Sequence, residues 1–263
     1  MTLSTQDLVL GYQNQRVIPA ANIVIEEGDL VSLVGPNGCG KSTLLGGLGG
    51  LLKPISGQVS LAGQCLSKWQ QKALARYIAL LPQSPSAPDS ISVAQLVRHG
   101  RYPHQGLLGL NSQDDVDAVE WALEMTGTIV LRDRNFSTLS GGEKQRVWIA
   151  MALAQQSKII LLDEPTTYLD VGHQLDVLNL LVELNQKHRL TVVMVLHDIN
   201  HASQYSDRII AMHNGKVIAD GKPVDVVTER LLDELFAIEV ELIQRREGHR
   251  CYPYCLPLRN DVF

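Results

Sequence analysis

The stretch GPNGCGKST, Gly35 to Thr43, has the residue types and spacing of a phosphate-binding loop, G-x-x-x-x-G-K-[ST]. A predicted buried strand over 30–34 precedes it, and a predicted helix follows from Thr43. The glycines let backbone N–H groups turn inward toward phosphate oxygens, and the helix adds the positive end of its dipole. In such a loop Lys41 contacts the β- and γ-phosphates, and the Ser42 hydroxyl contacts Mg²⁺. The stretch therefore predicts a nucleoside triphosphate site.

A second group that could bind an anion lies in LSGGE, Leu139 to Glu143. Ser140 and Glu143 have the S-x-x-E spacing of a capping box, which predicts that a helix begins here. The first N–H groups of that helix, near Gly141 and Gly142, have no partner within the helix, and its dipole favours an anion. Taken alone, the pattern indicates no more than a helix cap.

Two acids end a predicted buried strand in IILLDEPTTYLD. Asp163 at the strand end suits a contact with Mg²⁺, and Glu164, which projects differently, could polarise a water molecule. A solvated pair of carboxylates is the alternative. A further predicted strand over 191–196 ends at His197, and ligands bind where parallel strands end in polar residues.

Two features near the phosphate-binding loop leave alternatives open. Tyr12 could stack on a purine ring, or it could be an ordinary edge-strand tyrosine. The helix after the loop is predicted over 42–52, although four glycines each cost it about 0.5–1 kcal/mol relative to alanine. Close packing of the helix on the sheet would offset part of that cost. The four glycines are Gly46, Gly47, Gly49 and Gly50.

Periodicity and turn residues predict the remaining elements. Strands are expected over 4–11, 22–26, 58–61, 78–81, 208–212, 216–219 and 239–243. Helices are expected over 68–76, from Ser92, from Ser112 to Gly127 and over 172–187, with a helix pair from about 222. Asn214-Gly215 predicts a hairpin. A helical block between two α/β halves predicts a small second lobe.

Composition and charge disfavour several classes of protein. A chain of 263 residues can bury a substantial core, and a net charge of −5 without a basic block disfavours a nucleic-acid partner. No apolar run reaches the ~18–20 residues of a membrane helix and no signal-peptide pattern is present, so a cytosolic protein is expected. The four cysteines do not resemble a disulfide framework. Cys251 and Cys255 could hold a metal together with His249, although a reduced pair is the preferred interpretation.

Taken together, these motifs resemble those of the ATP-binding cassette (ABC) ATPase family, over nearly the whole chain and in the family's order. LSGGE is the most specific of them, because other P-loop families lack it. The resemblance implies an α/β fold: a P-loop NTPase core with a mainly parallel sheet, an N-terminal antiparallel β-subdomain and a helical subdomain inserted before the signature motif. It implies a single ABC domain, with the core at about 1–90 and 136–221, the helical lobe at about 91–135 and a C-terminal extension at about 222–263.

The same resemblance implies roles for individual residues. The nucleotide would be bound by Tyr12 as the adenine-stacking aromatic, by the P-loop residues Gly35, Pro36, Asn37, Gly38, Cys39, Gly40, Lys41, Ser42 and Thr43, and across a dimer by Ser140, Gly141, Gly142 and Asp170. Mg²⁺ would be held by Ser42, Gln83 and Asp163. The catalytic residues would be Glu164 as the base, Lys41, Gln83 in the loop that joins the lobes, and His197 as the γ-phosphate switch.

GRYPH (Gly100 to His104), LLDEPTTYLD and VLHDIN are similar to segments of the ATPases of bacterial importers for iron(III)-siderophores, and more loosely for haem and cobalamin. The resemblance implies an ATPase that energises uptake of such a chelate, as a peripheral protein on the cytoplasmic face of the bacterial inner membrane. Two copies would pair head to tail around ATP. They would dock on a multi-span permease near Arg101–His104 and act indirectly with a substrate-binding protein, without nucleic acid. The alternative is a cassette ATPase of iron–sulfur cluster assembly, since it shares the catalytic motifs.

Overall fold

The computed structural model describes residues 1–13, 15–106, 112–248 and 250–258. Its contacts divide the chain into two units, which are described in turn. The first unit comprises Met1–Ser67 and Val192–Phe263, and the second comprises Lys68–Thr191.

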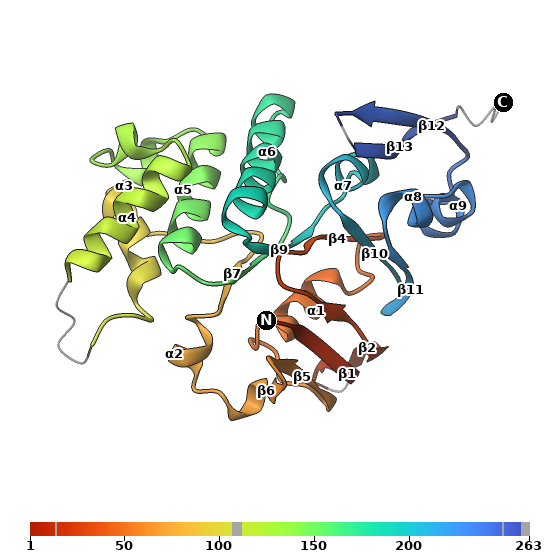
Figure 1. Ribbon diagram of the computed structural model, residues 1–263, viewed down its shortest axis with the longest axis horizontal. Coiled ribbons are helices and arrows are strands. Elements are labelled where there is room, and N and C mark those ends of the chain that lie inside the picture. Colours follow the sequence, from red (N-terminus) through yellow and green to blue (C-terminus); the bar gives the residue numbers. More distant parts are fainter. Residues whose placement is uncertain (14, 107–111, 249, 259–263) are drawn as a thin grey trace. The chain divides into compact units, whose positions relative to one another are not determined.

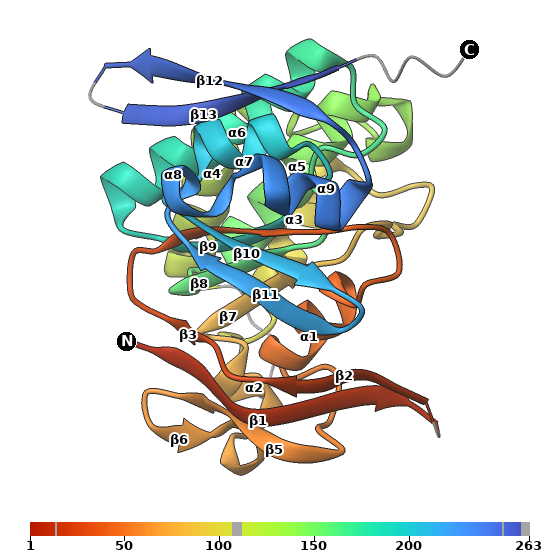
Figure 2. The same cartoon turned by 90° about the vertical axis from the view of Figure 1, so that its right-hand side faces the viewer.

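An antiparallel sheet opens the first unit, as predicted (Figure 2). Its strand order is β2-β1-β5-β6, and the short β3 also pairs with β1. The predicted strands did not include β2, whose sequence QRVIPAA contains a proline. Proline is tolerated on edge strands, and β2 lies at the edge of this sheet. The strands are β1 (Leu3–Tyr12), β2 (Gln15–Ala21), β3 (Val24–Ile25), β5 (Ser56–Leu61) and β6 (Gln64–Cys65).

The strand that leads into the P-loop, β4 (Leu30–Val34), is buried along its whole length. It pairs in parallel with β9 (Thr191–Val195) on one side and β10 (Arg208–His213) on the other. Apart from Ser32, whose buried hydroxyl pairs with that of Ser206, the strand is apolar, as a strand covered on both faces requires. β11 (Lys216–Gly221) pairs with β10 as the predicted hairpin, whose two turn residues, Asn214 and Gly215, have φ of 49° and 78°.

The helix after the P-loop, α1 (Lys41–Leu48), is shorter than predicted and packs against β1. Gly49 and Gly50 lie beyond its last residue, and Gly50 has a φ of +73°, where an L residue is strained. A Cβ on Gly47 would lie 2.4 Å from Cδ1 of Leu10, so this glycine permits the close approach of helix and sheet. Nothing in the structure explains Gly46.

The rest of the first unit consists of three short helices and a terminal hairpin. They are α7 (Ile199–Tyr205), α8 (Pro223–Val226), α9 (Glu229–Phe236), β12 (Val240–Glu247) and β13 (Arg250–Pro257). Figure 1 shows β13 beside α7. The Asn200 side chain accepts from the backbone N–H of Cys255 at 2.7 Å and donates to its carbonyl at 3.0 Å. The predicted tail contained one strand, and β13 is an addition to it.

Helices dominate the second unit. Its two strands, β7 (Ile78–Leu81) and β8 (Ile159–Leu162), pair in parallel. α3, α4 and α5 pack side by side (Figure 1), and each begins with a capping box. α2 is shorter than the predicted helix over 68–76, and its N-cap residue Gln70 makes no capping bond. The helices are α2 (Gln71–Leu74), α3 (Val93–Arg98), α4 (Gln113–Met125), α5 (Gly141–Ala154) and α6 (Val171–His188), with 3-10 turns η2 (His99–Arg101), η3 (Ile129–Leu131) and η4 (Phe136–Thr138). A further 3-10 turn, η1 (Leu66–Lys68), spans the boundary between the two units in the sequence.

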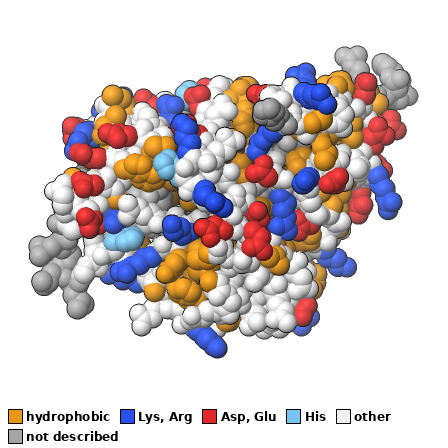
Figure 3. Space-filling view, in the orientation of Figure 1, with side chains coloured by type: hydrophobic (Ala, Val, Ile, Leu, Met, Phe, Trp, Pro, Cys, Tyr) orange, Lys and Arg blue, Asp and Glu red, His pale blue; other side chains and the backbone are white. Residues whose placement is uncertain are grey.

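The boundaries of the predicted core, helical lobe and C-terminal extension stay predictions, because the two units divide the chain at other positions. Among the described residues, no helix has the length and apolar character needed to cross a membrane. On the face drawn in Figure 3, cationic and anionic side chains are interspersed.

Candidate nucleotide site

The P-loop connects β4 to α1 through three glycines with positive φ. These angles are 146° at Gly35, 77° at Gly38 and 102° at Gly40, values that L side chains rarely adopt. Lys41 is buried, and its Nζ donates to the carbonyls of Gly35 at 2.8 Å and Pro36 at 3.0 Å. The lysine therefore holds the two ends of the loop together and keeps its ammonium inside the curve of the loop.

The N-terminus of α1 suits an anion. Gly40 is the N-cap, and no side chain caps the helix or places an acid in its first turn. A Cβ added to Gly38 would meet no atom within 4 Å, so the loop is open on that side. Asn37, Gly38 and Ser42 are exposed, whereas Gly35, Cys39, Gly40 and Thr43 are buried and Pro36 is half-buried. A positive helix end and a buried lysine fit the phosphates of a nucleotide.

Tyr12 and His197 belong to the same unit as the P-loop. Tyr12 is the last residue of β1 and is 57% exposed, so its ring face is accessible for stacking. His197 is exposed and lies two residues beyond the end of β9. Asp198, the next residue, caps α7 by accepting from the N–H groups of Asn200 and His201.

Gln83 and Glu164 meet in the second unit. The Gln83 amide donates to Oε2 of Glu164 at 2.5 Å, and the Thr167 hydroxyl donates to the same oxygen at 3.0 Å. Glu164 has a φ of +53°, an uncommon backbone conformation for a residue with a side chain. Asp163 continues from β8, and its N–H donates to the carbonyl of Leu81 at 2.9 Å. The two donors orient the Glu164 carboxylate while leaving it half-exposed.

The LSGGE segment begins α5 as predicted. The Ser140 hydroxyl accepts from the N–H of Glu143 at 3.3 Å, and the Glu143 carboxylate accepts from the N–H of Ser140 at 2.8 Å. Hydrogen bonds to the Glu143 carboxyl from the backbone and the side chain of Ser140 hold its pKa below the usual range. Ser140 and Gly141 are exposed, while Gly142 is buried.

Asp170 caps α6, an arrangement that was not predicted from the sequence. One carboxylate oxygen accepts from the N–H of His173 at 2.9 Å and lies 2.8 Å from Nδ1 of the same residue. The two bonds from His173 lower the pKa of the Asp170 carboxyl. An aspartate followed three residues later by histidine was the only sequence signal for this pair.

The four cysteines are free thiols. Burial raises the pKa of Cys39 in spite of the opposing charge of Lys41, so its thiol is held protonated. Burial and Asp198 raise the pKa of Cys255, whereas Cys251 is exposed on β13. His249 lies outside the described residues. Among those that are described, no group of three or more His, Cys, Asp or Glu side chains could hold a metal ion.

Comparison with known proteins identifies the family. The model of the family described as "ABC transporter" matches residues 19–167, more than half of the chain. The chain belongs to the ABC transporter family. ATP-binding subunits of these transporters are ATPases that energise transport, which confirms the predicted family, fold class and enzymatic activity of this cassette.

Several curated relatives match almost end to end. The cassette is 45% identical to the achromobactin transport ATP-binding protein CbrD of Dickeya dadantii (strain 3937), covering 98% of this chain and 96% of the relative. It is 43% identical to the iron(3+)-hydroxamate import ATP-binding protein FhuC of Bacillus subtilis (strain 168), covering 97% and 94%.

Solved structures of ABC transporter cassettes have the same fold as this chain. A transporter assigned to the metal-chelate type, in an inward-facing conformation, matches with a TM-score of 0.86 at 30% identity, covering 100% of this chain and 99% of that one. The dimeric cassette MJ0796 bound to ADP and Pi matches with a TM-score of 0.73 at 29% identity, covering 84% and 98%.

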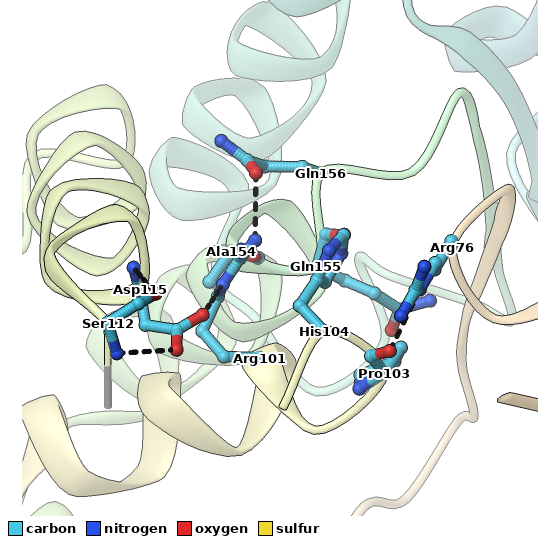
Figure 4. Close-up of polar contacts among 9 residues, drawn as sticks. All are labelled: Arg76, Arg101, Pro103, His104, Ser112, Asp115, Ala154, Gln155 and Gln156. Carbon is cyan, nitrogen blue, oxygen red and sulfur yellow. Dashed lines mark hydrogen bonds and ion pairs between the residues drawn. The ribbon is translucent and has the colours of Figure 1, made fainter. Parts of the chain in front are cut away.

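The GRYPH loop was expected to contact a permease near Arg101–His104, but the structure buries the first of these residues. Arg101 is 3% exposed, and its Nε donates to Oδ1 of Asp115 at 2.8 Å (Figure 4). Its Nη1 donates to the carbonyl of Ala154 at 2.7 Å and to Oε1 of Gln156 at 2.9 Å. Arg101 thus joins the start of α4 to the end of α5. The i,i+14 pairing with Asp115 is not visible in the sequence.

Gly100 and His104 of the same loop lie against α5, whereas Tyr102 is exposed. A Cβ on Gly100 would lie 2.1 Å from the carbonyl oxygen of Met151, so glycine permits the loop to lie on α5. His104 Nε2 lies 2.8 Å from the carbonyl oxygen of Gln155, and burial lowers the His104 pKa. Tyr102, by contrast, is 69% exposed. Residues 107–111, which follow in the sequence, lie outside the described residues.

Proposed function

We propose that this cassette is the ATP-hydrolysing subunit of a bacterial importer for an iron(III)-siderophore chelate, peripheral to the inner membrane on its cytoplasmic face. The observation that carries the proposal is the set of relatives that match nearly the whole chain. Those at 43–47% identity are named for transport of achromobactin, siderophores, iron(3+)-hydroxamate, petrobactin or ferric enterobactin. No relative among them is named for iron–sulfur cluster assembly, so the alternative has no comparable support.

The P-loop supports a role for Lys41 in holding the β- and γ-phosphates. Its ammonium donates to carbonyl oxygens of the loop and lies near the Cys39 sulfur, and an anionic phosphate would outcompete these neutral partners. Backbone N–H groups from Gly38 to Thr43 would surround the phosphates, and Tyr12 would stack on the adenine. ATP binding follows from the family, and these residue contacts are our proposal.

The residues proposed for Mg²⁺ offer the oxygen ligands that this cation prefers: a hydroxyl from Ser42, an amide oxygen from Gln83 and a carboxylate from Asp163. The Gln83 nitrogen faces Glu164, which leaves its amide oxygen for a ligand. When bound, Mg²⁺ would neutralise charge that develops on the phosphates.

Glu164 is the proposed general base. The carboxylate accepts from Gln83 and Thr167, and both bonds fix its orientation toward an attacking water. His197 is proposed to contact the γ-phosphate. Hydrolysis would then form a bond between the water oxygen and the γ-phosphorus and break the bond between that phosphorus and the β–γ bridging oxygen. The water proton would pass to Glu164, and ADP would be the leaving group.

Each cassette carries a P-loop and a signature helix, two separate anion sites. We propose that ATP is bound between the P-loop of one copy and the Ser140–Gly142 segment of a second copy, with Asp170 also facing that copy. Dimeric cassettes among the structural relatives support this arrangement. The proposed contact with the permease uses Tyr102, because Arg101 is buried. A substrate-binding protein would act through the permease.

Uptake assays test the transport function. A strain that lacks this gene would be given labelled ferric hydroxamate, ferric enterobactin or ferric petrobactin, and complemented with the parent or with Lys41→Ala. We expect the parent alone to restore uptake of one chelate. If no chelate depended on the gene while the purified protein hydrolysed ATP, the importer assignment would be wrong and the ATPase assignment would stand.

A further inference from the structure

The second glycine of the signature motif lies directly against a histidine ring. A Cβ on Gly142 would lie 2.1 Å from Cδ2, 2.5 Å from Cγ and 2.8 Å from Nε2 of His173. Cγ is the first ring atom, so a small rotation of the side chain could not relieve such an overlap. With the ring in this place, only glycine fits at position 142.

The ring is also held from its other side. His173 Nδ1 lies 2.8 Å and 2.9 Å from the two carboxylate oxygens of Asp170, and the same carboxylate caps α6 through the N–H of His173. The contact assigns the hydrogen to Nδ1. Asp170 therefore fixes both the start of α6 and the orientation of the ring.

Further contacts join the same two helix ends. The Gln174 amide donates to the carbonyl of Leu169 at 2.9 Å, which fixes the turn before α6. Leu169 in turn approaches Gly141, whose added Cβ would lie 3.8 Å from Cδ2 of the leucine. One turn along the helices, Arg146 and Asp176 form an ion pair of 3.6 Å. The N-terminal ends of α5 and α6 therefore pack against each other.

We infer that His173 is a positioning residue that couples the signature segment, Ser140–Gly142, to the turn Tyr168–Asp170. The inference rests on the proposed function, in which both segments face the second copy in the ATP-bound dimer. Because the ring touches one segment and hydrogen-bonds to the other, the two segments present a single preformed surface. Dimer closure then needs no separate ordering of each segment.

A double variant tests the contact itself without any nucleotide. Gly142→Ala should lower the melting temperature by about 3 °C or more, because the methyl group displaces the ring from Asp170. His173→Ala should lower it less. Gly142→Ala with His173→Ala should melt at the temperature of His173→Ala alone, because the overlap has been removed. A double variant that loses the sum of the two shifts would overturn the contact.

A second measurement tests the coupling. In a Glu164→Gln background, ATP-dependent dimerisation would be followed by light scattering, and nucleotide binding to the monomer by a fluorescent ATP analogue. His173→Ala should weaken dimerisation about tenfold and leave binding to the monomer unchanged. His188→Ala is the matched control, since His188 is the last residue of α6 and its ring packs on Trp121.

Three results would be decisive. Weakened dimerisation with unchanged monomer binding supports the coupling. Unchanged dimerisation in His173→Ala overturns it. If the Glu164→Gln parent fails to dimerise with ATP, the proposed dimer function is wrong, and the melting temperatures still decide whether His173 constrains position 142.

Discussion

At the scale of single residues, Glu164 has an uncommon backbone conformation and a carboxylate that two hydrogen bonds hold in place. Its φ of +53° costs a residue with a side chain of the order of 1–3 kcal/mol, and such outliers persist only where surrounding contacts fix them. Here the contacts are the hydrogen bonds from Gln83 and Thr167 to the carboxylate. The sequence indicated an acid at the end of a strand, but it carried no sign of the backbone conformation. The two donors that orient the carboxylate support the proposed role of Glu164 as a catalytic residue.

Glu164→Gln should separate binding from hydrolysis. The amide cannot accept the proton of the attacking water, so ATP turnover should fall by about 100-fold or more while ATP still binds. Light scattering with ATP and Mg²⁺ should show an accumulated dimer. Turnover near that of the parent would exclude Glu164 as the base.

Lys41→Ala should abolish ATP hydrolysis and weaken nucleotide binding, because the ammonium that compensates phosphate charge is lost. The loop carbonyls of Gly35 and Pro36 also lose their donor. Lys53→Ala, an exposed lysine of the same unit, is the control and should hydrolyse ATP like the parent. Steady-state ATPase assays and titration with a fluorescent analogue would measure both effects. Normal turnover by Lys41→Ala would contradict the P-loop assignment.

At the scale of elements, buried capping interactions hold the second unit together. Burial alone would raise the pKa of the Asp115 carboxyl, but hydrogen bonds from Arg101 and Ser112 outweigh it, and the pKa lies below its usual value. The capping box at Ser112 was readable in the sequence, because it is local. The ion pair of Asp115 with Arg101 could not be predicted from the sequence, because Arg101 reaches Asp115 only when α3, α4 and α5 pack together.

Asp115→Asn should destabilise the protein by about 3 kcal/mol at pH 7, since the Arg101 charge stays buried without its carboxylate. A lowered pKa in the folded state adds stability above the unfolded pKa of about 3.9, and this stability is lost as the pH falls through the folded value. The parent should therefore lose stability more steeply than Asp115→Asn below about pH 4. Denaturant unfolding at a series of pH values would measure it, with the exposed Asp117→Asn as control. Parallel curves for parent and Asp115→Asn would contradict this account.

The sequence predicted most elements and missed two strands that contain prolines. β2 and β13 contain prolines, which weaken the pattern of a strand, and each pairs with the strand that directly precedes it. α1 was expected to extend through Gly49 and Gly50, although these residues end it. The motifs that begin helices or follow buried strands were placed correctly, because their residues act within a few positions of one another.

At the scale of the whole molecule, the cassette needs a partner to do transport. The sequence suggested that the GRYPH loop as a whole faces that partner. The structure turns most of the loop inward: Gly100 and Arg101 pack on α5, His104 binds the end of α5, and only Tyr102 is largely exposed. Most residues of the GRYPH loop therefore pack inward, and Tyr102 is the one among them that is available for a contact with the permease.

Tyr102→Ala should abolish transport and reduce co-purification with the permease at least tenfold, because aromatic anchors contribute much of the energy of an interface. ATPase activity of the isolated cassette should be unchanged, since Tyr102 lies in none of the nucleotide-binding motifs. Val130→Ala, which alters an apolar side chain 83% exposed in the same unit, is the control. Intact co-purification of Tyr102→Ala would place the docking surface elsewhere.

The distribution of the cysteines determines how the protein can be labelled. Cys39 and Cys255 are buried with raised pKa values, so both resist alkylation at neutral pH. Cys251 is exposed on the terminal hairpin and Cys65 is partly exposed. With Cys65 replaced by serine, a maleimide dye or spin label would attach at Cys251 alone. The native chain therefore supplies a reporter position for distance measurements between two cassettes, and the P-loop thiol need not be removed to use it.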